Sequence, residues 1–443
     1  MNTKILAVVA VAIVVIAGIA VAVSMHQSSS RDPVVETGRL LVYGNANNDD
    51  YLDDRDLEMV QSIVNGETTW DSEEYPFADA NCDGEITSDD VTLIRNIIDG
   101  NTCTLYYLEY YESNSSAVVS ITYPMKTDSI GIYQYQTGFL VSMLGLWDNV
   151  DYADNTTLGY TTAFDTEGIN SYGNYSGSMM RTTSGLETFN SSNVDVLILN
   201  GYWDDTVVKD GLAAMGSDTQ VIKPYCQGTY AISSMLTFGF ILGCYDSASE
   251  YIAFYDKVMD YLNECLSGLS EEDYVTYYVV NNPTDSGAIK IRSSGSNGTY
   301  PDLAWVEMIP GVNLMPNGDN DTYQATRTAE WFLQEENASD YIIISMSSLS
   351  AYDNNVETAL NTFKEMFSQT QAYSDGNIIG LAYGYFNGLY SPSMLVLLAS
   401  YLYPDLVDQD YGWELFYEFF EKYHQPGSEG AEVYAGVYRM STE

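Results

Sequence analysis

The stretch SASEYIAFYDKVMDYLNECLSG (residues 247–268) predicts a long helix about which the larger part of the chain is arranged. Its apolar side chains recur every three and four residues, which gives one continuous apolar face. Ser247 and Glu250 fit a capping box at its start, and Gly268 can end it in a left-handed turn. At ~1.5 Å per residue this helix is about 30 Å long, so it can tie two lobes together.

A helix-to-strand pattern occurs on both sides of this helix. GLETF (185–189) leads into DVLIL (195–199), and AEWFL (329–333) leads into DYIII (340–344). Each is typical of a short amphipathic helix followed by a buried parallel strand. Further strand-like runs alternate with helical runs, and these runs are residues 130–135, 219–222, 274–280 and 378–381, after an exposed hairpin at 105–111 and 117–123. The pattern predicts an α/β fold with helices on both faces of mainly parallel sheets.

The composition excludes one class of partner and argues against catalysis. The 443 residues suffice for two or three domains, and 16 basic against 62 acidic residues give a net charge of -46, so the phosphates of a nucleic acid would be repelled. The 39 Tyr and the 46% share of apolar residues provide enough apolar surface for a folded core, so the chain is not a disordered acidic segment. The two histidines, His26 and His424, lie near no nucleophile motif, and no phosphate-binding glycine loop follows a strand. We therefore expect a binding protein and not an enzyme.

The start of the chain predicts export. Residues 5–23 form an unbroken apolar run that is about long enough to cross a bilayer, and Lys4 before it favours an N-terminus on the inner side. The alternative is a cleaved signal peptide, because Ala-Val-Ala at residues 20–22 resembles a processing site. The length of the run favours the anchor. We expect a single-pass cell-membrane protein whose bulk is extracellular, with residues 1–25 as anchor or signal and 26–39 as a polar spacer.

Export also bears on the cysteines and asparagines. Five Cys are too few and too scattered for a disulfide framework, although one bridge, such as Cys82 to Cys103, is compatible with their spacing. Asparagines within N-x-S/T sequons are candidate glycan sites and predict a glycoprotein. They are Asn114, Asn155, Asn174, Asn190, Asn297, Asn320 and Asn337.

Two copies of one loop pattern, residues 45–56 and 79–90, predict calcium binding. Calcium prefers six to eight oxygen ligands, and short oxygen-bearing side chains at alternating positions of a twelve-residue loop wrap around it. The predicted ligands are Asn45, Asn47, Asp49, Asp53 and Asp56 in the first loop and Asp79, Asn81, Asp83, Thr87 and Asp90 in the second. Asp50 stands where the second loop has Gly84, which strains the first loop unless Asp adopts a left-handed backbone. We expect two sites, the second stronger.

Two such loops, each followed by a helix and a glycine, resemble dockerin domains, which bind cohesin domains in surface-assembled complexes. The resemblance covers about residues 40–100 and implies a small α-helical domain. It also implies cohesin contacts at Asp54, Arg55, Ser88 and Asp89. Because the two copies differ there, interchangeable two-way binding is not expected. Calcium removal is expected to unfold residues 40–100 and to leave the large domain intact.

The rest of the chain resembles the substrate-binding proteins of ABC importers. YPMKTDSIGIY (123–133), WDNV (147–150) and the Ser-Pro and Tyr-Pro pairs at 391–392 and 403–404 carry the resemblance, which spans about residues 117–425. The branch it points to takes up iron–siderophores, haem and cobalamin. It implies a periplasmic-binding-protein-like fold, with lobes at residues 104–245 and 269–443 joined by the helix at 246–268.

Ligands of such sheets bind beyond the carboxyl ends of the strands. The aromatic and polar residues there suit a large planar or partly apolar metal chelate such as a corrinoid, porphyrin or catecholate complex. The candidates are Tyr133, Tyr135, Gln136, Tyr202, Trp203, Tyr225, Arg292, Tyr383 and Tyr385. Arg292 can pair with a ligand carboxylate, and an internal salt bridge is the alternative.

The same resemblance implies that one Glu on each lobe docks to the permease, and the matching positions are Glu187 and Glu330. The alternative is that each is a solvated Glu near a helix N-terminus. The sequence thus predicts a membrane-anchored receptor that captures a metal chelate for an ABC importer and docks to a cohesin-type partner through calcium. A structural or adhesive surface protein built on the same fold is the alternative.

Overall fold

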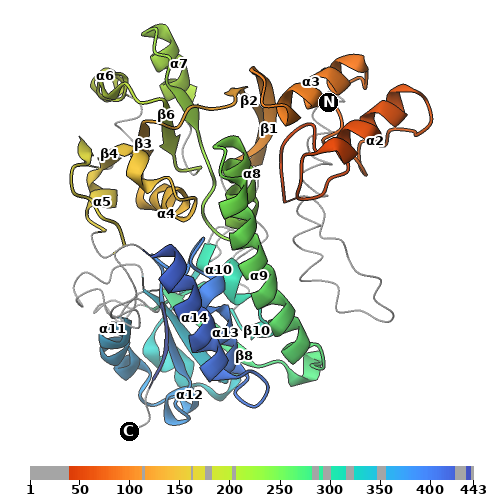
Figure 1. Ribbon diagram of the computed structural model, residues 1–443. Helices are drawn as coiled ribbons and strands as arrows, with labels where there is room; N and C mark the ends of the chain where they lie inside the picture. Colours follow the sequence, from red (N-terminus) through yellow and green to blue (C-terminus); the bar gives the residue numbers. More distant parts are fainter. Residues whose placement is uncertain are drawn as a thin grey trace. The chain divides into compact units, whose positions relative to one another are not determined.

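The computed structural model describes residues 39–440 except 112–114, 161–162, 175–181, 202–205, 282–288, 293–300, 316–323, 347–355 and 425–435. The chain divides into two compact units (Figure 1). The first contains the described residues up to Cys226 together with Tyr230–Ile252, and the second contains Gln227–Thr229 and the residues from Ala253 onward. The predicted anchor at residues 5–23 lies outside the described residues. No helix within the described ranges is long and apolar enough to cross a membrane.

The first unit begins with the two loops, each of which is followed by a helix. These helices are α2 (Asp54–Val64) and α3 (Ser88–Ile98), drawn in red and orange in Figure 1. A small hydrophobic core lies between them because each helix turns its apolar face inward. Its buried residues are Ala46, Leu57, Val60, Ala78, Ala80 and Ile94.

The hairpin that follows joins the loop region to the rest of the first unit. β1 (Cys103–Tyr111) pairs antiparallel with β2 (Ser115–Tyr123). On its other side, β1 is bridged to Val42, and the Tyr43 amide donates to the Tyr106 carbonyl at 2.9 Å. The chain just before the first loop therefore adds to the edge of this hairpin.

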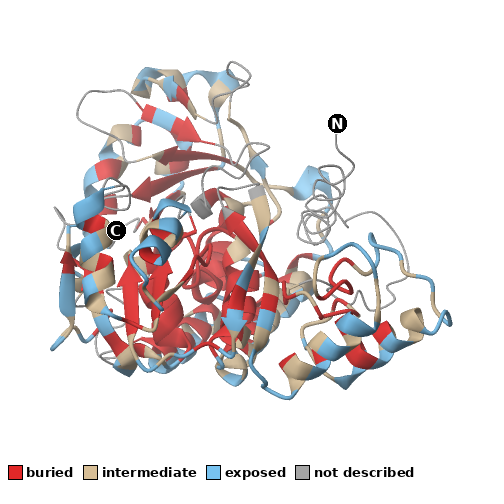
Figure 2. Ribbon diagram, turned by 90° about the horizontal axis from the view of Figure 1, so that it is seen from above, coloured by how far each residue is buried: buried red, intermediate tan, exposed pale blue. Residues whose placement is uncertain are grey.

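A five-stranded parallel sheet forms the centre of the first lobe, in the order β5-β4-β3-β6-β7. β3 and β6 are buried along their whole length, as the apolar runs predict (Figure 2). The strands are β3 (Ile130–Tyr133), β4 (Val150–Asp154), β5 (Asn170–Gly173), β6 (Val196–Leu199) and β7 (Gln220–Ile222). The helices are α4 (Tyr135–Met143), α5 (Asn155–Leu158), α6 (Thr183–Ser192), α7 (Thr206–Ala214) and α8 (Tyr230–Ile241), with a 3-10 turn η1 (Trp147–Asn149).

The long helix that the sequence predicts is α9 (Tyr245–Leu266). It starts two residues before the predicted capping box. Its buried apolar residues keep the predicted spacing and are Ala248, Tyr251, Ile252, Tyr255, Val258, Leu262 and Leu266. The residues up to Ile252 belong to the first unit, and those from Ala253 belong to the second.

The second unit contains a mixed sheet. Its central strands β8 (Thr276–Asn281), β12 (Tyr341–Met346) and β13 (Ile378–Ala382) are parallel. Beyond β8 the sheet continues with the antiparallel strands β9 (Ile289–Arg292) and β11 (Gln324–Arg327). Beyond β13 it ends with the antiparallel strand β14 (Val437–Arg439). The short strand β10 (Val312–Asn313) pairs parallel with β8. The helices are α10 (Pro301–Val306), α11 (Val356–Phe363), α12 (Gln371–Ser374), α13 (Pro392–Leu402) and α14 (Gln409–Tyr423), with the 3-10 turns η3 (Glu271–Asp273), η4 (Ala329–Leu333), η5 (Glu335–Asn337) and η7 (Lys364–Phe367).

The α/β class is confirmed, the sheet of the first lobe is parallel as predicted, and the sheet of the second unit is mixed because its edge strands are antiparallel. Two local predictions are wrong. The segment at 329–333 is the 3-10 helix η4 and not an amphipathic α-helix. All five cysteines are free, so Cys82 and Cys103 are not bridged. Among the sequons, Asn155 and Asn174 are exposed and hydrogen-bond to each other at 2.9 Å; Asn114, Asn297 and Asn320 lie outside the described residues. Glycosylation remains a prediction.

Candidate calcium loops and ligand-binding residues

The two loops share a set of hydrogen bonds at equivalent positions. The carboxylate at the twelfth position, Asp56 or Asp90, accepts the backbone amides of the third and ninth positions in its loop. These amides belong to Asn47 (3.1 Å) and Asp53 (2.8 Å) in the first loop and to Asn81 (3.2 Å) and Thr87 (2.8 Å) in the second. The ninth residue in turn caps the helix, so Asp53 starts α2 and Thr87 starts α3. Loop closure and helix initiation therefore use the same side chains.

The loops differ at the first and sixth positions. In the second loop, Asp79 accepts the amides of Asp83 (3.2 Å) and Gly84 (2.7 Å), and Gly84 is left-handed at φ +95°. In the first loop, Asn45 instead donates its amide group to the carbonyls of Leu40 (2.9 Å) and Asp49 (2.6 Å). These contacts leave its Oδ1 available.

The expected backbone strain at Asp50 is absent. Asp50 is not left-handed; the positive φ falls on the fourth position of both loops, 54° at Asn48 and 57° at Cys82. Asp50 uses its side chain elsewhere, because its carboxylate accepts the Arg39 Nε–H at 2.9 Å. The prediction of strain assumed a left-handed sixth residue in both loops, but the sixth residue is left-handed only in the second loop, at Gly84.

The donor atoms of both loops suit calcium, which prefers oxygen. The Asn45 side chain is fully buried, and no donor among the described residues reaches its Oδ1. Burial raises the pKa of Asp56 to about 6, and the charges of Asp49 and Asp53 add to the rise. Burial also raises the pKa of Asp79. A divalent cation would offset both effects.

The carboxylates are nevertheless occupied with backbone amides. Across the described ranges, no group of three or more His, Cys, Asp or Glu side chains is placed to hold a metal. The residue types of the loops thus fit calcium, while their side chains here serve the loop backbone.

The predicted cohesin contacts Asp54, Arg55, Ser88 and Asp89 are all exposed in the first turns of α2 and α3. Arg55 also forms ion pairs of 2.9 Å with Asp49 and with Asp53. Its guanidinium holds the pKa of Asp53 below the usual range. A partner that engages Arg55 would therefore alter the charge around the first loop.

In the first lobe the structure separates the predicted ligand contacts into two groups. Tyr133 has no exposed surface and packs in the core of the parallel sheet, and Tyr225 lies in a core cluster with Leu41 and Phe77. Both therefore pack in the core of the first unit in this structure. Tyr135 is half-buried at the start of α4 and stacks on Tyr160 at 4.3 Å. Gln136, next to Tyr135, is buried; Tyr202 and Trp203 lie outside the described residues.

In the second unit the sheet topology places Arg292 away from the carboxyl ends of the parallel strands. β9 is antiparallel to β8, and Arg292 at its carboxyl end lies opposite Val279 in the middle of β8. It is thus not beyond the carboxyl end of a parallel strand. Tyr383 follows the carboxyl end of the parallel strand β13, and its amide donates to the Met346 carbonyl at 3.0 Å. Tyr385 is buried against Tyr390.

The sequence did not point to Gln134, which follows β3 at the carboxyl edge. Its backbone is left-handed at φ 94°, and its amide donates to Asp154 Oδ1, at the end of β4, at 2.7 Å. Its own Oε1 is buried and meets no donor from the described residues. Strained backbone and an unmet acceptor are common at binding sites. Nothing in the local sequence marks a left-handed Gln.

The two predicted permease contacts are both exposed. Glu187 lies on α6 and Glu330 on η4. A hydrogen bond from the Thr328 side chain lowers the pKa of Glu330.

Comparisons with known proteins agree with both resemblances. Residues 43–99 match the model of the dockerin type I domain. Among curated proteins, none matches the chain. Solved structures share the fold at low identity. The TroA-like periplasmic binding protein FepB from Veillonella parvula has 15% identity and a TM-score of 0.53, over 75% of this chain and 100% of that one. CeuE of Helicobacter pylori with Ni(II) bound has 14% identity and a TM-score of 0.50, over 72% and 97%. The chain therefore carries a dockerin type I domain at residues 43–99 together with the fold of the TroA-like periplasmic binding proteins.

Proposed function

We propose that this protein is a substrate-binding protein that captures a metal chelate outside the cytoplasmic membrane for an ABC importer. The observation that carries the proposal is the union, in one chain, of a periplasmic-binding-protein fold with a dockerin domain. The fold presents the carboxyl ends of parallel strands in each unit, and Tyr135 and Tyr383 stand there with accessible surface. Iron–siderophore, haem or corrinoid is the proposed ligand class, and no enzymatic activity is proposed. The apolar N-terminal run would anchor the protein in the membrane.

Native mass spectrometry of the purified protein tests the ligand. The expected result is a mass increment that matches a corrinoid, haem or iron–siderophore and that disappears on denaturation. Titration with each of these compounds, followed by Tyr and Trp fluorescence, gives an independent answer. Failure of all three to bind would favour the alternative, a surface protein that uses this fold for structure or adhesion.

Glu187 and Glu330 are proposed to dock to the permease. Two carboxylates, one on each unit, would engage a two-fold permease in a single orientation. Glu187→Lys combined with Glu330→Lys is expected to abolish ligand delivery and to leave ligand affinity unchanged. The matched control reverses two other exposed glutamates, Glu73→Lys and Glu271→Lys. Equal uptake by both double variants would remove the docking role.

The dockerin domain is proposed to bind a cohesin-type surface partner when its loops hold calcium. The first-loop oxygens of Asn45, Asp49 and Asp56 and their second-loop equivalents would be the ligands, and the ion would neutralise their charges. Asp83→Ala and Asp90→Ala are each expected to remove one calcium site in isothermal titration calorimetry. Unchanged stoichiometry in both variants would contradict the assignment of the second loop.

A further inference from the structure

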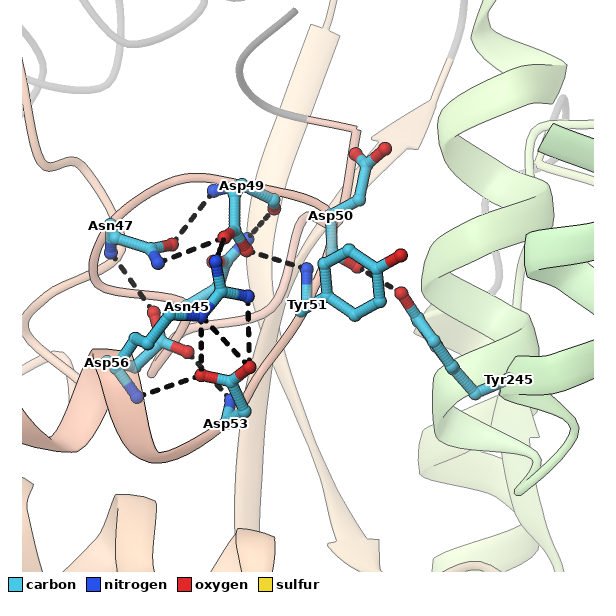
Figure 3. Close-up of polar contacts among 9 residues, drawn as sticks. Asn45, Asn47, Asp49, Asp50, Tyr51, Asp53, Asp56 and Tyr245 are labelled. Carbon is cyan, nitrogen blue, oxygen red and sulfur yellow. Dashed lines mark hydrogen bonds and ion pairs between the residues drawn. The ribbon is translucent and has the colours of Figure 1, made fainter. Parts of the chain in front are cut away.

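The first calcium loop is held by a residue from far along the chain. Tyr245, the first residue of α9, donates its hydroxyl to the Asp50 carbonyl at 2.7 Å. Its ring also lies against the ring of Tyr51, with centroids 5.7 Å apart (Figure 3). One side chain thus contacts both the sixth and the seventh residues of the loop.

The contact lies where the first loop lacks its own turn. In the second loop Gly84 turns at φ +95° and its amide reaches back to Asp79 at 2.7 Å. Asp50 has no such conformation; Arg39 holds its carboxylate and Tyr245 holds its carbonyl. The hydrogen bonds from Arg39 and Tyr245, both outside the loop, therefore fix the sixth residue of the first loop, which in the second loop is fixed by the glycine turn.

The peptide group that Tyr245 holds is next to a calcium donor. In loops of this kind, the backbone carbonyl of the seventh residue is a ligand. That residue is Tyr51, whose amide donates to Asp49 Oδ1 at 2.7 Å. The loop also contains a fully buried side chain, Asn45, whose Oδ1 meets no donor in the described part of the chain. The loop thus already has an acceptor that lacks a cation or donor.

We infer that Tyr245 of α9 is a positioning residue for calcium at the first loop, through its hydrogen bond to the Asp50 carbonyl and its contact with Tyr51. The inference rests on the proposed calcium binding of the loops. Binding equilibria that are coupled affect each other equally. If the Tyr245 contact strengthens calcium binding by the first loop, calcium in turn stabilises the Tyr245 contact, and with it the start of α9, by the same free energy. The second loop, which makes its own turn, does not depend on Tyr245.

The test measures calcium affinity of the full chain by isothermal titration calorimetry, with one loop silenced at a time. Asp90→Ala leaves the first loop to bind, and Asp56→Ala leaves the second. Tyr245→Phe is then added to each background, since it keeps the ring contact and removes only the hydroxyl. One lost hydrogen bond is expected to weaken calcium about 3- to 10-fold in the Asp90→Ala background. The Asp56→Ala background is expected to show no change.

Tyr261→Phe is the matched control. Tyr261 lies on the same helix, and its hydroxyl is also hydrogen-bonded to the backbone of another segment, where it accepts the Asp408 amide at 3.1 Å. This variant is expected to leave both calcium affinities unchanged. Equal affinity with and without Tyr245→Phe, or equal weakening in both backgrounds, would overturn the inference and leave the proposed calcium sites standing. Absence of calcium binding in the unaltered chain would overturn the proposed sites as well.

Discussion

The first unit contains a buried ion pair between Glu109 and Lys223. The Glu109 carboxylate and the Lys223 ammonium group lie 3.3 Å apart, with only 3% and 4% of their side chains exposed, and the Tyr107 hydroxyl donates to Glu109 at 3.1 Å. Removing one partner leaves the other charged in an environment that solvates it poorly. The pair belongs to the first unit and joins β1 to the residue after β7.

Glu109→Gln is therefore expected to destabilise the first unit by about 3–5 kcal/mol. The comparison is Glu418→Gln, which breaks the exposed Lys257–Glu418 pair and is expected to cost about 0–1 kcal/mol. Urea unfolding followed by circular dichroism measures both. Similar midpoints for the two variants would mean that Glu109 is not acting as a buried charge.

Gly201 is required by a close approach of two backbone segments. A Cβ there would lie 2.7 Å from Tyr225 Cα, and the Gly201 amide already donates to the Pro224 carbonyl at 2.8 Å. Gly201→Ala is expected to destabilise the first unit by about 1–3 kcal/mol, because the backbone must move apart. Gly268 is not left-handed, contrary to the predicted helix end, and no heavy atom lies within 4 Å of a Cβ there, so Gly268→Ala is expected to be neutral or slightly stabilising. Thermal unfolding of the two variants checks the difference.

At the scale of elements, the segment before the first loop joins the dockerin region to the first lobe. Its Leu41 amide donates to Thr237 Oγ1 of α8 at 3.0 Å, and its Leu41 carbonyl accepts the Leu108 amide of β1 at 2.9 Å. The Leu41 side chain packs in a cluster with Phe77, Leu108 and Tyr225. One short segment thus contributes to both structures.

Leu41→Ala is expected to cost about 2–5 kcal/mol, because it leaves a cavity among side chains from four separate segments. Leu333→Ala, at a leucine that is 44% exposed, is expected to stay within about 0.5 kcal/mol of the unaltered chain. Chemical denaturation of both variants makes the measurement. If Leu41→Ala and Leu333→Ala destabilise the chain by similarly small amounts, the Leu41 segment does not hold the dockerin region and the first lobe together.

At the scale of the whole molecule, the shared unit changes what calcium removal should do. Sequence reasoning predicts that chelation unfolds residues 40–100 alone. In the structure these residues share a compact unit with the first lobe, through the Leu41 cluster and the Tyr245 contact.

Chelation is therefore expected to lower hydrogen-exchange protection in residues 40–100 and also in β1, while β12 and β13 of the second unit stay protected. Hydrogen exchange measured by mass spectrometry, with calcium and with chelator, reports on all three regions at once. If hydrogen-exchange protection falls only in residues 40–100, these residues unfold as an independent domain, as the sequence predicts.

Local sequence determined much of this protein. The two oxygen-rich loops, the helices that follow them, α9 and the buried strands β3, β6, β12 and β13 depend on patterns within a few residues, namely oxygen side chains at alternating positions and apolar periodicity. Such patterns act through near neighbours, and they need no knowledge of the rest of the fold.

The tertiary structure alone decided the remainder, because it depends on which distant segments meet. Strand direction placed Arg292 away from the carboxyl ends of the parallel strands, since β9 runs antiparallel to β8. Packing between distant segments buries Tyr133 and Tyr225, two of the predicted ligand contacts, in core clusters. The first loop is completed by Tyr245, which lies 195 residues from Asp50. A glycine turn can be recognised within the sequence of a loop, whereas a turn held by another helix exists only once the chain has folded.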